Sequence, residues 1–164
     1  MLNMGWSSDG SVLETVLYAH AASTSMMAGL IWFVQIVHYP LLARVPGEGF
    51  VAYLAGHQRR VTLVVAPTML IELASAVLLV GASMSGIVSG WAAGSGAVLI
   101  GLAWCSTFLI QVPLHARLSR GKNERLIRIL VLTNWLRTLT WSARMGIALV
   151  LMGPVWQTAG VWPR

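Results

Sequence analysis

The sequence predicts an all-α integral membrane protein, a bundle of four transmembrane helices that forms one domain over residues 1–164. Hydrophobic residues make up 57% of the chain and charged residues only 10%, whereas a typical soluble domain is about 25% charged. The mean hydropathy is +0.73. Two stretches without a charged residue, 15–43 and 73–116, are long enough for one and two helical crossings at about 20 residues each. A soluble bundle would need more charged residues to cover its surface.

The four spans are predicted near residues 12–43, 58–82, 93–118 and 123–152. Pro40 and the following turn residues Pro46, Gly47 and Gly49 are expected to end the first helix. A helical pattern that starts at Phe50 leads into the second span, so this helix is expected to begin outside the hydrocarbon. The Gly- and Ser-rich segment 81–96 is expected to connect the second and third spans.

The basic residues predict the orientation of the bundle. The chain carries a net charge of +6, which in a soluble protein would suggest binding to nucleic acid. Here the basic residues gather between spans one and two and around the connection of spans three and four: Arg44, Arg59, Arg60, Arg117, Arg120, Lys122, Arg125 and Arg128. The positive-inside rule places both groups in the cytoplasm and both termini outside it. The expected partners of these residues are therefore membrane lipids and not nucleic acid.

The chain also matches itself at a nearly constant offset. Residues 40–44 (PLLAR) resemble residues 113–117 (PLHAR), 73 positions later, and residues 76–81 resemble residues 148–153, 72 positions later. Each matching unit contains two spans. The sequence therefore predicts two helical hairpins of the same orientation, related by an axis along the membrane normal.

Polar residues within the spans predict a functional interior, because such residues are costly in lipid and usually face the bundle centre. At about 100° per residue, each span places its polar residues on one stripe. The stripes consist of His20, Thr24, Met27, Gln35 and His38; His57, Thr68, Glu72 and Ser75; Trp104, Thr107, Gln111 and His115; and Asn134, Arg137, Trp141 and Arg144.

Three histidines support the leading hypothesis of a metal or haem site. His38, His57 and His115 are expected at one level near the cytoplasmic surface. Imidazoles from separate helices at one height can bind a metal ion or b-type haem. The residues expected to contact such a cofactor are Gln35, Gln111, Asn134 and Arg144. The alternative is that the histidines lie at the membrane interface and bond to lipid headgroups, water or backbone carbonyls.

Glu72 supports a second hypothesis, a membrane enzyme without metal. It is the only acidic residue within a span, and an unpaired carboxylate in hydrocarbon is costly, so an ion pair with Arg137 or Arg144 is expected. That pair can be purely structural. In the catalytic interpretation, Glu72, Arg137 and a histidine act on a lipophilic substrate such as a quinone, isoprenoid or polyketide. The arginine would hold an anionic or carbonyl group while Glu72 or the histidine serves as general base.

A third hypothesis is an accessory subunit of a respiratory or photosynthetic membrane complex. In that case the polar stripes only hold the helices together. Assembly as a homo-oligomer or within a larger membrane complex is compatible with all three hypotheses.

Several segments resemble those of small bacterial four-span membrane proteins of uncharacterised function. They are residues 32–40 (WFVQIVHYP), 111–115 (QVPLH) and 134–138 (NWLRT), followed by Trp141 and Arg144. The resemblance covers nearly the whole chain from the first span to the fourth. It implies a four-span fold and a bacterial inner-membrane location, and it implies no reaction.

Overall fold

The computed structural model describes residues 10–158, without the side chains of three residues in the last helix. The helices are α1 (Ser11–Phe33), η1 (Val34–His38), α2 (Tyr39–Arg44), α3 (Gly47–Met84), α4 (Gly90–Ser106), η2 (Thr107–Gln111), α5 (Val112–Leu118), α6 (Glu124–Leu151) and α7 (Gly153–Thr158). The elements η1 and η2 are single π-helical turns, so α1–η1–α2 and α4–η2–α5 are each one continuous helix. The described residues contain no strand, which confirms the all-α prediction.

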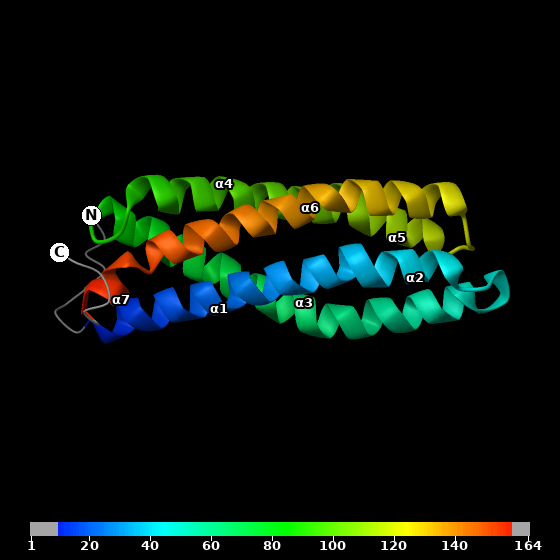
Figure 1. The fold of residues 1–164 in the computed structure, drawn as a ribbon, viewed down its shortest axis with the longest axis horizontal. Coiled ribbons are helices and arrows are strands. Elements are labelled where there is room, and N and C mark those ends of the chain that lie inside the picture. Colours follow the sequence, from blue (N-terminus) through cyan, green and yellow to red (C-terminus); the bar gives the residue numbers. More distant parts are fainter. Residues whose placement is uncertain (1–9, 159–164) are drawn as a thin grey trace.

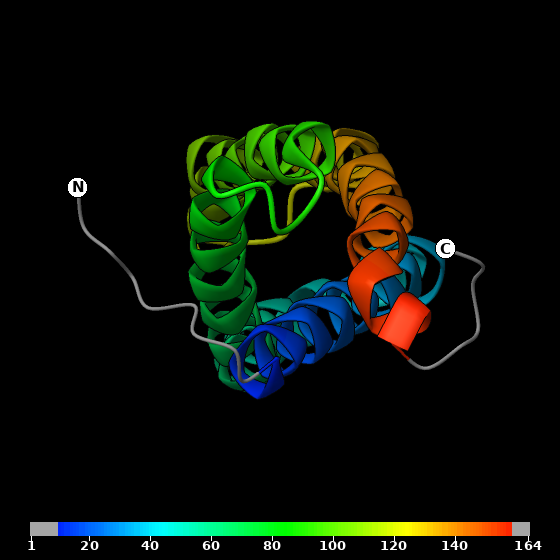
Figure 2. The same cartoon turned by 90° about the vertical axis from the view of Figure 1, so that its left-hand side faces the viewer.

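Four long helices form a ring. Contacts join α1 to α3, α3 to α4, α4 to α6, and α6 back to α1. Figure 2 shows this ring end-on, with the tilted long helices along the sides of a square. Side chains that point inward from all four helices therefore meet along one central axis.

The surface of this bundle is apolar, whereas charged and polar side chains lie in its interior beside an apolar core. Large hydrophobic side chains are exposed along the helices, among them Leu63, Leu109 and Leu139. The buried side chains include Gln35, Glu72, Gln111, Asn134, Arg137 and Arg144. A bundle surrounded by water shows the opposite distribution, so this arrangement indicates a lipid environment.

Three helices are long and apolar enough to cross a membrane: Ser11–Arg44, Gly47–Met84 and Gly90–Leu118. The fourth long helix, α6, has 28 residues, but its arginines lower its hydropathy. Arg137 and Arg144 are buried in the bundle, while Leu132, Leu136 and Leu139 cover the outer face of α6. From Ile129 to Val150, the residues that α6 exposes are therefore apolar.

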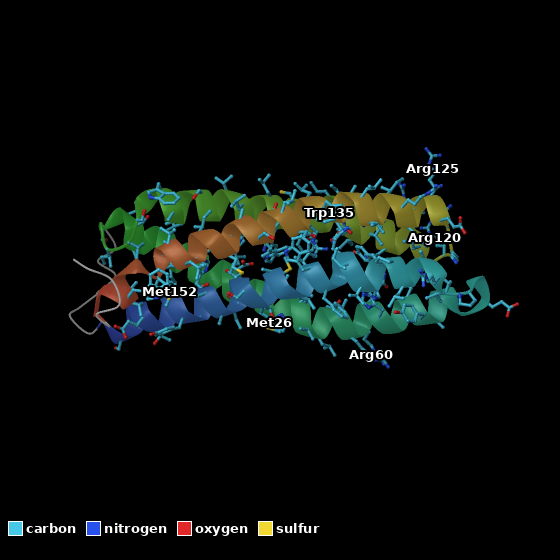
Figure 3. The ribbon with its side chains drawn as sticks, viewed as in Figure 1. Met26, Arg60, Arg120, Arg125, Trp135 and Met152 are labelled. Carbon is cyan, nitrogen blue, oxygen red and sulfur yellow. The ribbon has the colours of Figure 1, made fainter. Side chains whose placement is uncertain are left out.

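The two ends of the bundle differ in charge. The α2–α3 and α5–α6 connections lie at one end, and the α3–α4 connection lies at the other with α7 and the start of α1 (Figure 1). We call the first the basic end and the second the far end. Arg60, Arg120 and Arg125 point away from the helices near the basic end, whereas Met152 lies near the far end (Figure 3). The expected placement of the two chain termini falls outside the described residues.

The long helix α3 extends beyond the thickness of a membrane. Its 38 residues span about 57 Å at about 1.5 Å per residue, against a hydrocarbon core of about 30 Å. Its first turns are held by Phe50 and Leu54, which are fully buried against Tyr39 and Leu42. The helix therefore begins well before the apolar span, as its sequence pattern predicts.

The prediction that Pro40 ends the first helix is wrong. The chain stays helical through Pro40 to Arg44, and Gly47 and Gly49 lie in the first turn of α3 and not in a loop. Proline lacks the N–H that an α-helix needs, but it is tolerated in the first turn of a helical segment. Pro40 is in that position because a new segment, α2, starts at Tyr39.

A π turn precedes each of two matching prolines. Before Pro40, the Tyr39 N–H donates to the carbonyl of Val34, five residues earlier. Before Pro113, the Val112 N–H donates to the carbonyl of Thr107 in the same way. Each π turn inserts one residue into the helix and lets it continue past the proline. Such turns also rotate the following side chains, here those that enter the pocket described below.

Candidate functional site

The centre of the bundle holds a fully buried ion pair. The Nε atom of Arg144 on α6 lies 2.8 Å from Oε1 of Glu72 on α3, and the two side chains are 1% and 0% exposed. This confirms the expectation that Glu72 pairs with one of the two buried arginines. The pair joins helices that lie diagonally across the ring.

Side chains of α1 and α6 also donate hydrogen bonds to the Glu72 carboxylate. Oε1 also accepts a hydrogen bond from the Thr24 hydroxyl at 3.0 Å, and Oε2 accepts one from the Trp141 indole N–H at 3.1 Å. Arg144 Nη1 donates to the carbonyl of Gly96 on α4. We call Thr24, Glu72, Gly96, Trp141 and Arg144 the ion-pair cluster. Because the cluster contains a residue from each of the four long helices, it fixes their positions relative to one another.

A separate pocket of about 610 Å³ lies between the ion-pair cluster and the basic end. One wall is formed by α3, with His57, Thr62 and Val65, and the other by η2 and α5, with Gln111 and His115. Residues of α1, Val34 of η1, Tyr39 of α2 and Arg137 of α6 complete the lining. The volume falls within the range of about 300–1,000 Å³ that is typical of small-molecule sites. Glu72 and Arg144 do not line this pocket.

Arg137 is the charged residue of the pocket. Its side chain is 8% exposed, and Nη1 donates to Asn134 Oδ1 at 3.2 Å. Its guanidinium lies 5.3 Å from the centre of the Trp141 ring, and its Nε atom has no hydrogen-bond partner. Among the described residues, no carboxylate lies within ion-pair distance of Arg137. Trp141 thus contacts both Glu72 and Arg137, and Glu72 is paired with Arg144.

Neutral polar side chains support the pocket from behind. The Tyr39 hydroxyl donates to Gln111 Oε1 at 3.3 Å, and Gln111 Nε2 donates to the Thr133 hydroxyl at 3.0 Å. Asn134 Nδ2 donates to Gln35 Oε1 at 2.8 Å. Tyr39 and Gln111 line the pocket, whereas Gln35 and Asn134 bond to each other outside its lining. Of the predicted polar residues, Gln111 therefore lies in the pocket wall, while Gln35 and Asn134 lie behind it.

The three predicted histidines lie near one another, but only two of them line the pocket. His57 and His115 line the pocket. His38 lies against His57, with ring centres 3.7 Å apart and ring planes inclined by 13°. The His115 ring is 6.4 Å from that of Tyr39, and its Nδ1 atom has no hydrogen-bond partner. Within residues 10–158, no group of three or more His, Cys, Asp or Glu side chains is placed to hold a metal ion.

Two residues of the site carried no predicted role. Tyr39 lines the pocket because it directly follows η1, and the only signal in the sequence is the proline after it. Trp141 falls on the polar stripe of α6, but its contacts with both Glu72 and Arg137 depend on the rotation of two helices. Neither of these two contacts of Trp141 follows from the spacing of residues within one helix.

Comparison of the chain with protein-family models, with curated proteins and with solved structures found no match. The geometry of the pocket and of the ion-pair cluster is therefore the basis for the function proposed below.

Proposed function

We propose that the protein is a membrane enzyme that binds a lipophilic molecule in the pocket, with an anionic or carbonyl oxygen of that molecule held by Arg137. The supporting observation is the buried guanidinium of Arg137, which has no carboxylate partner among the described residues. A buried charge is costly unless it is paired and hydrogen-bonded. Arg144, only seven residues further along α6, has such a partner within the protein, so Arg137 is the arginine suited to a ligand.

The rest of the lining suits the apolar part of such a molecule. Met27, Leu30 and Ile31 of α1 and Val61 and Val65 of α3 line the pocket. Apolar walls with a few polar groups that fix orientation are typical of sites for small lipophilic ligands. A quinone, an isoprenoid or a polyketide combines an apolar skeleton with an oxygen group in this way.

The residues at the pocket suggest proton-transfer chemistry. Arg137 would stabilise negative charge that develops on the substrate oxygen. His115 and His57 are the candidate acid or base, because both line the pocket and His115 Nδ1 has no partner. We do not assign the base to Glu72, because its oxygens accept hydrogen bonds from Thr24, Trp141 and Arg144.

The metal and haem hypothesis has less support from this geometry. The lone pair of an imidazole nitrogen lies in the plane of its ring. Because the His38 and His57 rings are stacked nearly parallel, their lone pairs do not converge on one ion at the usual distance of about 2.0–2.1 Å. Two axial haem ligands would lie on opposite faces of the porphyrin and not stack on each other.

The proposal is tested by identifying the molecule that copurifies with the protein. Organic extraction followed by mass spectrometry is expected to yield about one lipophilic molecule with an acidic or carbonyl oxygen per chain. Arg137→Gln is expected to reduce its amount at least about ten-fold, because a hydrogen bond to a charged group contributes about 1.5–3 kcal/mol.

Arg128→Gln is the matched control, since it removes the same charge from an exposed position of α6. Retention of the molecule by this control and its loss in Arg137→Gln would support the proposal. Equal amounts in the two variants would contradict it. A haem absorption band, or one metal ion per chain, that is lost in His38→Ala would instead support the metal hypothesis.

We propose further that the protein resides in a bacterial inner membrane with its basic end in the cytoplasm. The support is the excess of arginine and lysine in the α2–α3 and α5–α6 regions, whereas the α3–α4 connection carries none. The pocket would then lie in the cytoplasmic half of the membrane.

The two hairpins are best explained, we propose, by duplication of one ancestral unit. The π turns η1 and η2 start at Val34 and Thr107, which are 73 positions apart, as are Pro40 and Pro113. Glu72 and Arg144 are separated by 72 positions, the offset of the second sequence match. The central ion pair would thus join equivalent positions of the two units.

A further inference from the structure

We infer that the ligand reaches the pocket sideways from the bilayer, between α3 and α5, and that it is a membrane-resident amphiphile with a single negative charge. This inference rests on the proposed function and specifies its substrate class. It follows from three properties of the pocket: where its wall is open, what surrounds the opening, and how many charges line it.

The ring of helices is open on one side near the basic end. There α3 makes no extensive contact with η2 or α5, although it contacts α4 closer to the far end. The opposite side is closed, because η1 and α2 both pack against α6. Three residues that line the pocket at the open side, Thr62, Val112 and Ala116, are exposed at the surface of the bundle. The mouth of the pocket therefore lies between α3 and α5, and we call it the lateral mouth.

Exposed apolar residues lie beside the lateral mouth on both helices that form it. Leu63 on α3 is 72% exposed and Leu109 on η2 is 73% exposed, and Phe108 and Val64 beside them are exposed as well. Exposed apolar side chains of this size, gathered on neighbouring turns, are typical of a surface that faces lipid or a partner and not water. A molecule dissolved in the hydrocarbon can thus enter without crossing water.

The charged residues of the pocket lining indicate the charge of the ligand's headgroup. Among the residues that line the pocket, Arg137 is the only Lys or Arg, and no Asp or Glu is present. One guanidinium balances one negative charge, as in a carboxylate or an enolate. A phosphate monoester carries up to two charges and would leave one uncompensated in an apolar site. The ligand class is therefore a lipophilic monoanion.

The test uses palmitic acid with a photoreactive diazirine in its chain, added to the full-length protein in phosphatidylcholine vesicles. Illumination is expected to label residues of the pocket lining, including Met27 and Val65, as located by mass spectrometry. Ala116→Trp, which fills the lateral mouth, is expected to reduce this labelling at least about ten-fold. Val112→Trp is a second obstruction at the same mouth in case the first variant does not fold.

Leu132→Trp is the matched control, because it adds the same side chain to the exposed outer face of α6, away from the lateral mouth and outside the pocket lining. It is expected to leave labelling of the pocket unchanged. The corresponding diazirine alcohol is expected to label the lining at least about ten-fold less than the acid, because it carries no charge for Arg137.

The outcomes separate this inference from the proposed function. If folded Ala116→Trp and Val112→Trp are labelled like the wild type while Arg137→Gln is not, the lateral route is overturned and the binding site stands. If water-soluble hexanoic acid competes as well as palmitic acid, access from the bilayer is likewise overturned. If acid and alcohol label equally, the single-charge assignment is wrong. If Arg137→Gln is labelled in full, the proposed function itself fails.

Discussion

Replacing Glu72 with glutamine is expected to lower the free energy of unfolding by about 3–5 kcal/mol, the usual effect of breaking a buried ion pair from one side. The variant leaves the Arg144 guanidinium buried without a counter-charge. The amide group of glutamine would also direct an N–H toward Arg144 or Trp141, which are both donors to this carboxylate. Unfolding measured in lipid bicelles by steric trapping provides the test.

A double replacement is the control for this prediction. Glu72→Leu combined with Arg144→Leu removes both charges and is expected to recover most of the lost stability, because apolar residues can replace a buried pair at little cost. If the single variant is as stable as the wild type, the pair does not hold the bundle together. If the double variant is no more stable than Glu72→Gln, lost packing and not the unpaired charge explains the effect.

Leu139→Arg is expected to destabilise the protein in a bilayer by about 2.5–3.5 kcal/mol, the cost of an arginine at the centre of a transmembrane helix. Leu139 is 60% exposed near the middle of α6, the helix whose composition alone does not qualify it as a span. On a surface in contact with water, the same change would be nearly neutral. The measurement is the free energy of unfolding in phosphatidylcholine bicelles.

Leu139→Ala controls for the loss of the leucine side chain at the same position. The difference between the arginine and alanine variants then reports the environment of this face. A large difference supports α6 as a fourth crossing with a lipid-facing surface. Variants of equal stability would show that this face of α6 contacts water or another protein.

The ion-pair cluster and the pocket are two different uses of polar residues in one bundle. In the cluster, the carboxylate accepts from three side chains, and residues of four helices meet. In the pocket, Arg137 has an unpartnered Nε atom and His115 an unpartnered Nδ1 atom, while in the cluster Nη2 of Arg144 has no partner. Trp141 connects the two regions, because its N–H contacts Glu72 and its ring contacts Arg137. We expect the first region to stabilise the bundle, and we propose that the second binds the ligand.

The sequence predicted much of the fold because lipid imposes a simple rule. Polar residues on one stripe of a helix must face inward, and Glu72, Asn134 and Arg144 are fully or almost fully buried as that rule requires. The expected ion pair of Glu72 is also present. These results need only the period of the helix and the cost of a charge in hydrocarbon.

The details of the site depend on contacts that helical period does not describe. The π turn before Pro40 keeps the helix intact and changes the direction of Tyr39, where the sequence pattern suggested a helix end. Glu72 pairs with Arg144 and not with Arg137, and Trp141 contacts both Glu72 and Arg137; the period of one helix predicts neither result. The open side of the pocket results from the packing of whole helices, which no single stripe encodes.

A structure of the protein purified with its natural lipids tests the central claim most directly. We predict density for one elongated molecule that passes through the lateral mouth, with an oxygen about 2.7–3.2 Å from the Arg137 guanidinium and its apolar part along Val61 and Val65. Density for a metal ion or haem bound by His38, His57 and His115, or a pocket that contains only water, would contradict the proposal.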